Sequence, residues 1–178
     1  MAQVPYASAI GSLMYAILCT RPDIAYAISV TSRYQSNPGP DHWTTVKNIL
    51  KYLRRTKDMV LVYGGGELRL DGFTDSDFQS DVDDRKSISG YIFTCNGGAV
   101  IWKSSKQETI ADSTTEAEYI AASDAAKEAA KEPMSHQKSK HIERSYHIIR
   151  EIIGRGDVDV QKVASADNVV DPLTKAMT

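Results

Sequence analysis

The first 56 residues of the chain repeat apolar side chains at helical spacing. Three segments show this period, residues 6–20, 22–36 and 41–56, and a turn-forming Asn-Pro-Gly-Pro sequence separates the last two. In the third segment the apolar side chains fall on one helical face: Trp43, Val46, Ile49, Leu50 and Leu53. The pattern predicts a helical unit of three helices, of which the first, strongly apolar one is buried.

After the glycine run at 64–66 the pattern changes from helical spacing to alternation. Residues 67–75, 87–95 and 98–105 alternate apolar and polar side chains, and the sequence CNGGA between the last two is a tight hairpin signal. These segments predict an antiparallel meander of three strands. The glycine run is then the boundary between a helical unit of residues 1–63 and a second unit of residues 66–178.

The rest of the chain mixes helical and alternating segments. Ser113-x-x-Glu116 is a capping box, which predicts a long helix that runs to about Pro133 and gives Glu116 a structural role. Further along, the pattern predicts a helix at 140–153, a strand at 157–165 and a short terminal helix at 167–177. The order of elements predicts an α/β fold.

Composition narrows the functional classes. The 178 residues are 42% hydrophobic and 25% charged, as in globular proteins. Cys19 and Cys95 match no zinc or redox spacing, so a reducing intracellular setting is expected. The apolar run at 7–19 is too short to cross a bilayer and follows no basic signal region, so no membrane partner is expected.

The net charge of −2 hides a segregation along the chain. Residues 67–84 hold seven acids and one base, whereas residues 127–155 hold seven bases and four acids. An acidic cluster is typical of a solvated loop or a cation site, and a basic segment could bind a phosphate backbone.

Three acids stand where folding does not require one: Asp75 at the end of the first strand, Glu118 just inside the capped helix, and Asp171 at the start of the last helix. Carboxylates gathered from separate elements repel one another unless a cation holds them, and hard oxygen ligands suit magnesium. Structural alternatives stay open. Asp75 could belong with the neighbouring acids to a solvated hairpin loop, and Asp171 before Pro172 could be an N-cap.

Four stretches carry a family resemblance: GFTDSDFQSDVDDRKSISGYIF, STTEAEYIAASDA, HQKSKHIERSYHIIREI and DNVVDPLTK. In order and wording they resemble the ribonuclease H domain at the end of copia-type retrotransposon Pol polyproteins. The sequence before them, from YASAIGSLMY to KYLRRT, resembles the connection between reverse transcriptase and that domain. No Tyr-x-Asp-Asp polymerase motif is present in the sequence.

The resemblance implies a ribonuclease H-like mixed sheet, preceded by a helical connection segment. It implies that Asp75, Glu118 and Asp171 are catalytic and ligate two Mg²⁺ ions, with Glu118 also positioning the attacking water. Asn168 and Leu173 support the assignment of Asp171, because they keep the family's spacing. The implied reaction is hydrolysis of RNA in RNA–DNA hybrids. The implied partners are the hybrid and the reverse transcriptase portion of the polyprotein, in a cytoplasmic virus-like particle or in the nucleus.

One departure from the family lies in AAKEAAKEP at 125–133, which repeats four residues. The family has at this point a fourth strand with a further catalytic aspartate, which this sequence lacks. We expect that a deletion of roughly 30 residues, about one crossover unit, joined two direct repeats near 126–132. A family variant that never had the strand is the alternative.

The missing strand predicts three consequences. Residues 157–163 should pair in parallel with the first strand, because an open edge is an aggregation liability. The three carboxylates should still converge at one end of the sheet. The chain should have little or no ribonuclease H activity, since a four-carboxylate site keeps three.

Two other functions stay open. The chain could be a non-catalytic nucleic-acid-binding module, or it could be a relic without a function. The candidate phosphate contacts of the binding module are Lys103, Lys106, Lys138, Lys140 and Arg144.

Overall fold

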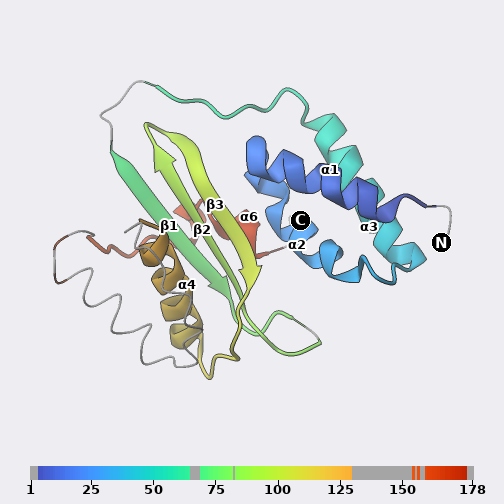
Figure 1. Cartoon of the computed structure of the whole chain (residues 1–178). Helices are drawn as coiled ribbons and strands as arrows, with labels where there is room; N and C mark the ends of the chain where they lie inside the picture. The colour runs from blue at the N-terminus through green and yellow to red at the C-terminus, as the bar shows by residue number, and fades with distance from the viewer. Residues whose placement is uncertain are drawn as a thin grey trace.

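A computed structural model describes residues 4–64, 69–81, 83–129, 154, 156 and 159–175 (Figure 1). The described helical elements before the sheet are α1 (Tyr6–Cys19), the 3₁₀ turns η1 (Pro22–Ile24) and η2 (Ser32–Tyr34) on either side of α2 (Ala25–Thr31), and α3 (Pro40–Arg55). The strands are β1 (Leu70–Asp77), β2 (Ile88–Cys95) and β3 (Gly98–Lys106). They are followed by α4 (Thr114–Ala129), η3 (Ser165–Asp167) and α6 (Asp171–Thr174). The fold class is therefore α/β, as the sequence predicts.

The helical unit is held together by one apolar cluster, in which Ile10, Ile28 and Val46 from its three α-helices are fully buried. A hydrogen bond of 2.7 Å from the Tyr6 hydroxyl to the carbonyl of Thr31 links the first and second helices. The predicted helix at 22–36 is divided into η1, α2 and η2, beginning at Pro22 as expected. The helical spacing thus identified the right segments but not the 3₁₀ ends.

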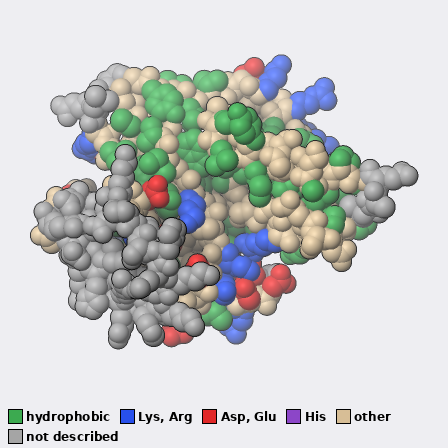
Figure 2. All heavy atoms as spheres, in the orientation of Figure 1, with side chains coloured by type: hydrophobic (Ala, Val, Ile, Leu, Met, Phe, Trp, Pro, Cys, Tyr) green, Lys and Arg blue, Asp and Glu red, His purple; other side chains and the backbone are tan. Residues whose placement is uncertain are grey.

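The first helix is buried on one face only, which corrects the expectation of a fully buried helix. Tyr6, Ile10 and Leu13 face the core, but Tyr15 is 71% exposed and Leu18 is 76% exposed. Apolar exposure continues in the segment after α3, at Met59, Val60, Val62 and Tyr63. Figure 2 shows apolar side chains along this upper side of the molecule, over α1 and the connecting segment.

The three strands form an antiparallel sheet in the order β1-β2-β3. The predicted hairpin between β2 and β3 turns at Asn96 and Gly97, which have φ of 53° and 82° and connect Cys95 to its partner Gly98. Both positive φ values match the Asn-Gly preference of two-residue hairpins. The meander read from the sequence is confirmed.

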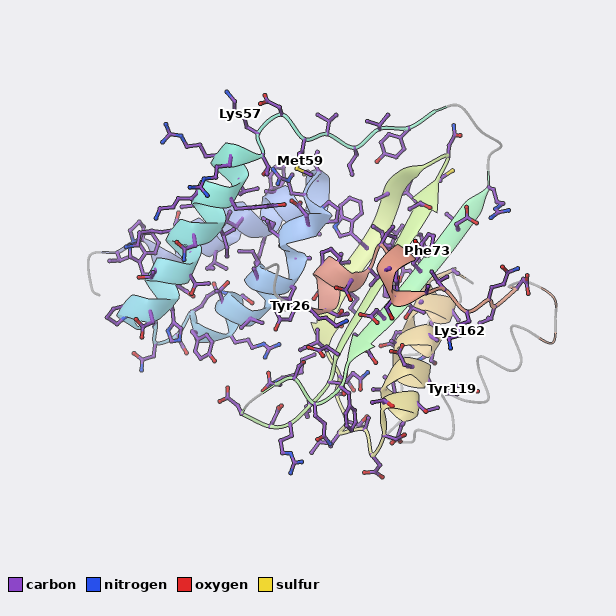
Figure 3. All side chains as sticks on the ribbon, turned by 180° about the vertical axis from the view of Figure 1, so that it is seen from behind. Tyr26, Lys57, Met59, Phe73, Tyr119 and Lys162 are labelled. Atoms are coloured by element: carbon purple, nitrogen blue, oxygen red, sulfur yellow. The ribbon has the colours of Figure 1, made fainter. Side chains whose placement is uncertain are left out.

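Helices cover both faces of the sheet (Figure 1). Against α4, Tyr91 and Phe93 of β2 pack on Ala125. On the other face Ile92 packs with Val170 and Leu173 of the C-terminal segment, and with Ala25 of α2. Seen from behind, Phe73 of β1 lies beside this C-terminal segment (Figure 3).

The close approach of α6 depends on Gly90 in β2. A Cβ atom at Gly90 would lie 2.9 Å from side-chain carbons of Thr174 and Val170, and 3.1 Å from Cβ of Leu173. Such distances are too short for carbon atoms, so α6 could not seat this deeply above any other residue. Gly90 pairs with Asp75 across the sheet, so the same glycine sets how near α6 comes to Asp75.

The predicted parallel pairing of residues 157–163 with β1 is wrong in the part that the structure describes. Residues 159–164 form no strand there, and Val160 and Val163 are exposed. A side chain meets the edge of β1 instead: the Asn168 amide nitrogen donates to the Thr74 carbonyl at 3.1 Å. This bond satisfies one of the backbone groups that a fourth strand would have paired.

Candidate active site

Asp75, in the second half of β1, points to the sheet face that α6 covers. Its Oδ2 accepts a hydrogen bond of 2.5 Å from the hydroxyl of Thr174, a residue with no exposed surface. The Lys175 ammonium nitrogen lies 3.9 Å from the same oxygen. Only 15% of the Asp75 side chain is exposed, so the interpretation of Asp75 as a solvated loop residue is wrong.

Asp171 is the first residue of α6 and does not act as its N-cap. The N-cap residue is Val170, and no side chain caps the helix. The Asp171 carboxylate instead binds the Lys175 ammonium at 2.5 Å, four residues along the chain. The N-cap alternative for Asp171 is therefore wrong, and its carboxylate faces the same lysine as Asp75.

Glu118 lies on α4, two residues after Glu116 of the capping box. Ser113 Oγ accepts a hydrogen bond from the Glu116 backbone N–H at 3.1 Å, and Glu116 Oε2 accepts one from the Asp112 N–H at 2.5 Å. Glu116 thus has the structural role read from the sequence, and Glu118 has none at the helix start.

The surroundings of Glu118 raise the pKa of its carboxyl. Burial raises the pKa of its carboxyl, and the negative charge of Asp75 raises it further. A hydrogen bond from the Ser76 backbone and the positive charge of Lys175 act in the opposite direction but do not cancel the rise. Glu118 therefore shares an electrostatic neighbourhood with both Asp75 and Lys175.

The three acids lie in one neighbourhood but do not form a ready metal site. Asp75 projects to the α6 face of the sheet, whereas Glu118 comes from α4 on the opposite face, and the charge of Asp75 acts on Glu118. Within the described ranges, no three His, Cys, Asp or Glu side chains lie close enough to hold one metal ion. Carboxylate oxygens suit Mg²⁺ chemically, but in this arrangement Lys175 and Thr174 already contact them, so the residues as placed do not fit a metal pair.

The acidic hairpin loop is not a uniformly solvated loop. Asp81 is buried and pairs with Arg33 of η2 and, at 3.4 Å, with Lys106 of β3. Its Oδ1 also accepts hydrogen bonds from the N–H groups of Asp83 and Asp84. Burial alone would raise the pKa of Asp81, but these hydrogen bonds and the two cations outweigh it and lower the pKa to about 2.

Of the predicted phosphate contacts, the structure describes two. Lys103 is exposed on β3. Lys106 binds Asp84 at 2.9 Å and Asp81 at 3.4 Å, so its charge is engaged within the fold. Lys138, Lys140 and Arg144 lie outside the described residues, as do the predicted helix at 140–153 and residues 130–133 of the repeat.

Sequence reasoning missed Thr174 and Lys175 as members of this neighbourhood. A signal was available: they follow Asp171 at spacings of three and four, which place side chains on one face of a helical turn. The sequence alone could not show that this turn is seated on β1.

Comparison with known proteins identifies the class. The α/β architecture is consistent with a fragment of a ribonuclease H-like domain. The chain is 44% identical, over 206 aligned positions and 99% of its length, to the retrovirus-related Pol polyprotein from transposon TNT 1-94 of Nicotiana tabacum. It is 31% identical, over 97% of its length, to the Pol polyprotein from transposon RE2 of Arabidopsis thaliana. The chain belongs to the retrotransposon Pol polyprotein family, as a fragment, and it spans 16% and 14% of these two relatives.

A shorter relative carries a different name. The chain is 47% identical over 130 positions to the secreted RxLR effector protein 161 of Plasmopara viticola, covering 72% of this chain and 92% of that protein. No protein-family profile matches the chain, and no solved structure matches it. No helix of the described residues is long and apolar enough to cross a membrane.

The alignments also contain a length difference. The match to the tobacco polyprotein occupies 206 positions, although 99% of this chain is only about 176 residues. About 30 positions of the alignment are therefore unmatched in this chain, net of other gaps, and they are internal because the match spans almost the whole chain. The Arabidopsis alignment, with 204 positions over 97% of the chain, has a similar excess.

Proposed function

We propose that this chain is the connection and ribonuclease H-like portion of a copia-type Pol polyprotein, and that its ancestral reaction was Mg²⁺-dependent hydrolysis of RNA in RNA–DNA hybrids. Asp75 and Asp171 would have been metal ligands, and Glu118 would have held one metal and positioned water. We further propose that the chain as it stands has little or no such activity.

The observation that carries this proposal is the arrangement of the three acids. Asp75, Glu118 and Asp171 come from three elements into one neighbourhood, as a remnant of a carboxylate site would. The described residues nevertheless offer no three-ligand metal cluster. Loss of one positioned electrostatic group commonly lowers an enzymatic rate by about 10² to 10³, and loss of metal placement costs more.

The internal length difference supports the same proposal. About 30 unmatched positions is the size expected for the missing strand with its aspartate and neighbouring residues. The repeated Ala-Ala-Lys-Glu of 125–132 is the proposed junction.

A cleavage assay with a restored variant tests the proposal. The purified chain is incubated with a fluorescently labelled RNA–DNA hybrid in MgCl₂ and in MnCl₂, beside a variant in which the unmatched segment of the tobacco relative is inserted between the two repeats. We expect no cleavage by the original chain and cleavage by the restored variant that disappears on Asp75→Asn. Robust Mg²⁺-dependent cleavage by the original chain, abolished by Asp75→Asn, would contradict the proposed impairment.

The reverse transcriptase portion of a Pol polyprotein is the proposed protein partner. The exposed apolar side chains of α1 and the following connection, Tyr15, Leu18, Val60 and Val62, support it, because such side chains suit burial against another folded unit. The binding-module alternative is weakened by Lys106, whose ion pairs to Asp84 and Asp81 would compete with phosphate contact. The binding-module alternative would be favoured if the restored variant bound the RNA–DNA hybrid in a salt-sensitive way but did not cleave it.

A further inference from the structure

The side chain of Lys175, 45% of which is exposed, reaches two of the candidate carboxylates. Its ammonium nitrogen lies 2.5 Å from Asp171 Oδ1 and 3.9 Å from Asp75 Oδ2. The pKa of Lys175 is raised, first by its hydrogen bond to Asp171 and also by the charges of Asp75, Asp171 and Asp77, although burial lowers it. Lys175 also acts on Glu118, whose pKa its charge lowers. One ammonium group thus lies within 4 Å of two carboxylates that come from different elements of the fold.

The backbone around Lys175 is anchored, although the side chains of Lys175 and Asp171 are 45% and 46% exposed. Val170, Leu173 and Thr174 before it have at most 2% of their surface exposed. The Lys175 backbone N–H closes the last turn of α6 on the Asp171 carbonyl at 3.1 Å. The Thr174 hydroxyl, next to it, binds Asp75 directly. The packing of α6 against the sheet therefore positions the Lys175 ammonium group near Asp75 and Asp171.

We propose that Lys175 is the internal counter-cation of this carboxylate cluster, and that a divalent ion can bind Asp75 and Asp171 only when the Lys175 ammonium leaves. Carboxylates at such a site repel one another without a cation, and here a residue of the chain supplies the positive charge. An ammonium group has no lone pair and no free coordination position for water, so it neutralises the site without activating a nucleophile.

Lys127 provides a matched comparison. Its ammonium group forms an ion pair with Asp124 of α4 at 3.2 Å, at a spacing of three residues. Like the Lys175–Asp171 pair, this ion pair joins a lysine to an acid that precedes it by about one helical turn. Among the described residues, neither Lys127 nor Asp124 forms an ion pair with Asp75 or Asp171. Removal of Lys127 deletes a positive charge of the same kind without opening the cluster.

The experiment is a calorimetric titration of the full chain with MnCl₂, comparing the original protein with Lys175→Met, Lys175→Arg and Lys127→Met. Removing the competing cation should strengthen Mn²⁺ binding by Lys175→Met about tenfold or more. The Lys175→Arg and Lys127→Met variants should bind as weakly as the original chain. Equal Mn²⁺ affinity in Lys175→Met and the original chain, or an equal gain in Lys127→Met, would overturn the proposal.

A second measurement uses the original chain, so it does not depend on the folding of a variant. Millimolar MgCl₂ or MnCl₂ should leave the thermal unfolding midpoint unchanged, because a ligand stabilises a fold only when it binds it. A clear rise of the midpoint would overturn the proposal. The cluster is the one discussed under the proposed function, but both tests measure binding and not cleavage, so either proposal can fail without the other.

Discussion

The side chain of Asn168 satisfies the backbone of Thr74, 94 residues earlier, through a hydrogen bond of 3.1 Å from its amide nitrogen to the carbonyl oxygen. In the same side chain Oδ1 accepts the Val170 N–H at 3.3 Å, just before α6. One residue therefore links the edge of β1 to the start of the helix that carries Asp171. Among the described residues no strand pairs with the outer edge of β1, and at Thr74 the Asn168 side chain supplies the missing hydrogen bond.

Replacing Asn168 should separate these two roles. Asn168→Ala removes both hydrogen bonds and should lower the free energy of unfolding by about 1 to 3 kcal/mol, because the Thr74 carbonyl loses its partner. Asn168→Asp keeps the acceptor for Val170 and should lose only the bond to Thr74. Urea unfolding measures both, with Asn37→Ala in an exposed turn as the control, where a change within about 0.5 kcal/mol is expected. Equal stability of Asn168→Ala and the control would show that the bond contributes nothing.

Asp81 should make stability sensitive to acid. Its folded pKa of about 2 lies below the ordinary value of 3.8, so its contribution is complete above about pH 5 and is lost as the pH falls towards 2. Asp81→Asn should destabilise the protein by about 1 to 3 kcal/mol at pH 7, since Arg33 and Lys106 lose a shared partner. Unfolding curves between pH 2 and pH 7 should show this difference shrinking towards low pH.

Asp83→Asn is the control for the acid effect. Asp83 is exposed in the same loop and contributes its backbone N–H to Asp81, which the substitution keeps. Its stability should follow that of the original chain at every pH. A difference for Asp81→Asn that stays constant down to pH 2 would contradict the assignment of the pKa.

The ionised Glu118 carboxylate should lower the stability of the folded protein at neutral pH. Because burial and the Asp75 charge raise its folded pKa, the folded state holds the proton more tightly than the unfolded state, and stability falls as the pH rises through the Glu118 titration. Glu118→Gln should therefore unfold at a higher urea concentration than the original chain at pH 7, and the gain should vanish in acid. Glu116→Gln, which keeps the capping acceptor, should show no such pH-dependent gain. A destabilised Glu118→Gln at pH 7 would contradict the prediction.

Gly90 should be intolerant of any side chain. A methyl group there would meet Thr174 and Val170 at 2.9 Å, so Gly90→Ala should displace α6 and destabilise the fold by about 1 to 3 kcal/mol. Gly11→Ala is the matched control, because it adds the same methyl group in α1 where no atom lies within 4 Å. That control should be stabilised by about 0.5 to 1 kcal/mol. Similar losses in both variants by thermal unfolding would show that the close approach of α6 is not the cause.

The sequence by itself determined the elements whose signals are local. The helical face of α3, the Asn96–Gly97 hairpin and the capping of α4 by Ser113 and Glu116 were all readable, because each depends on residues within a few positions of one another. The order of the motifs likewise determined the family, and it marked Asp75, Glu118 and Asp171 as the acids to follow. Leu50, placed on the buried face of α3 by spacing, is 44% exposed, since periodicity gives a direction but not what packs there.

Only the tertiary structure decided what surrounds those acids. At the outer edge of β1 the Thr74 carbonyl accepts a hydrogen bond from Asn168, and residues 159–164 form no strand there. Asp75 accepts a hydrogen bond from Thr174, which is 99 residues later in the sequence. These contacts follow from the seating of α6 over Gly90, which depends on the shapes of two surfaces and on no local pattern. For the same reason Lys175, an ordinary lysine in the sequence, becomes a cation among carboxylates once the fold is formed.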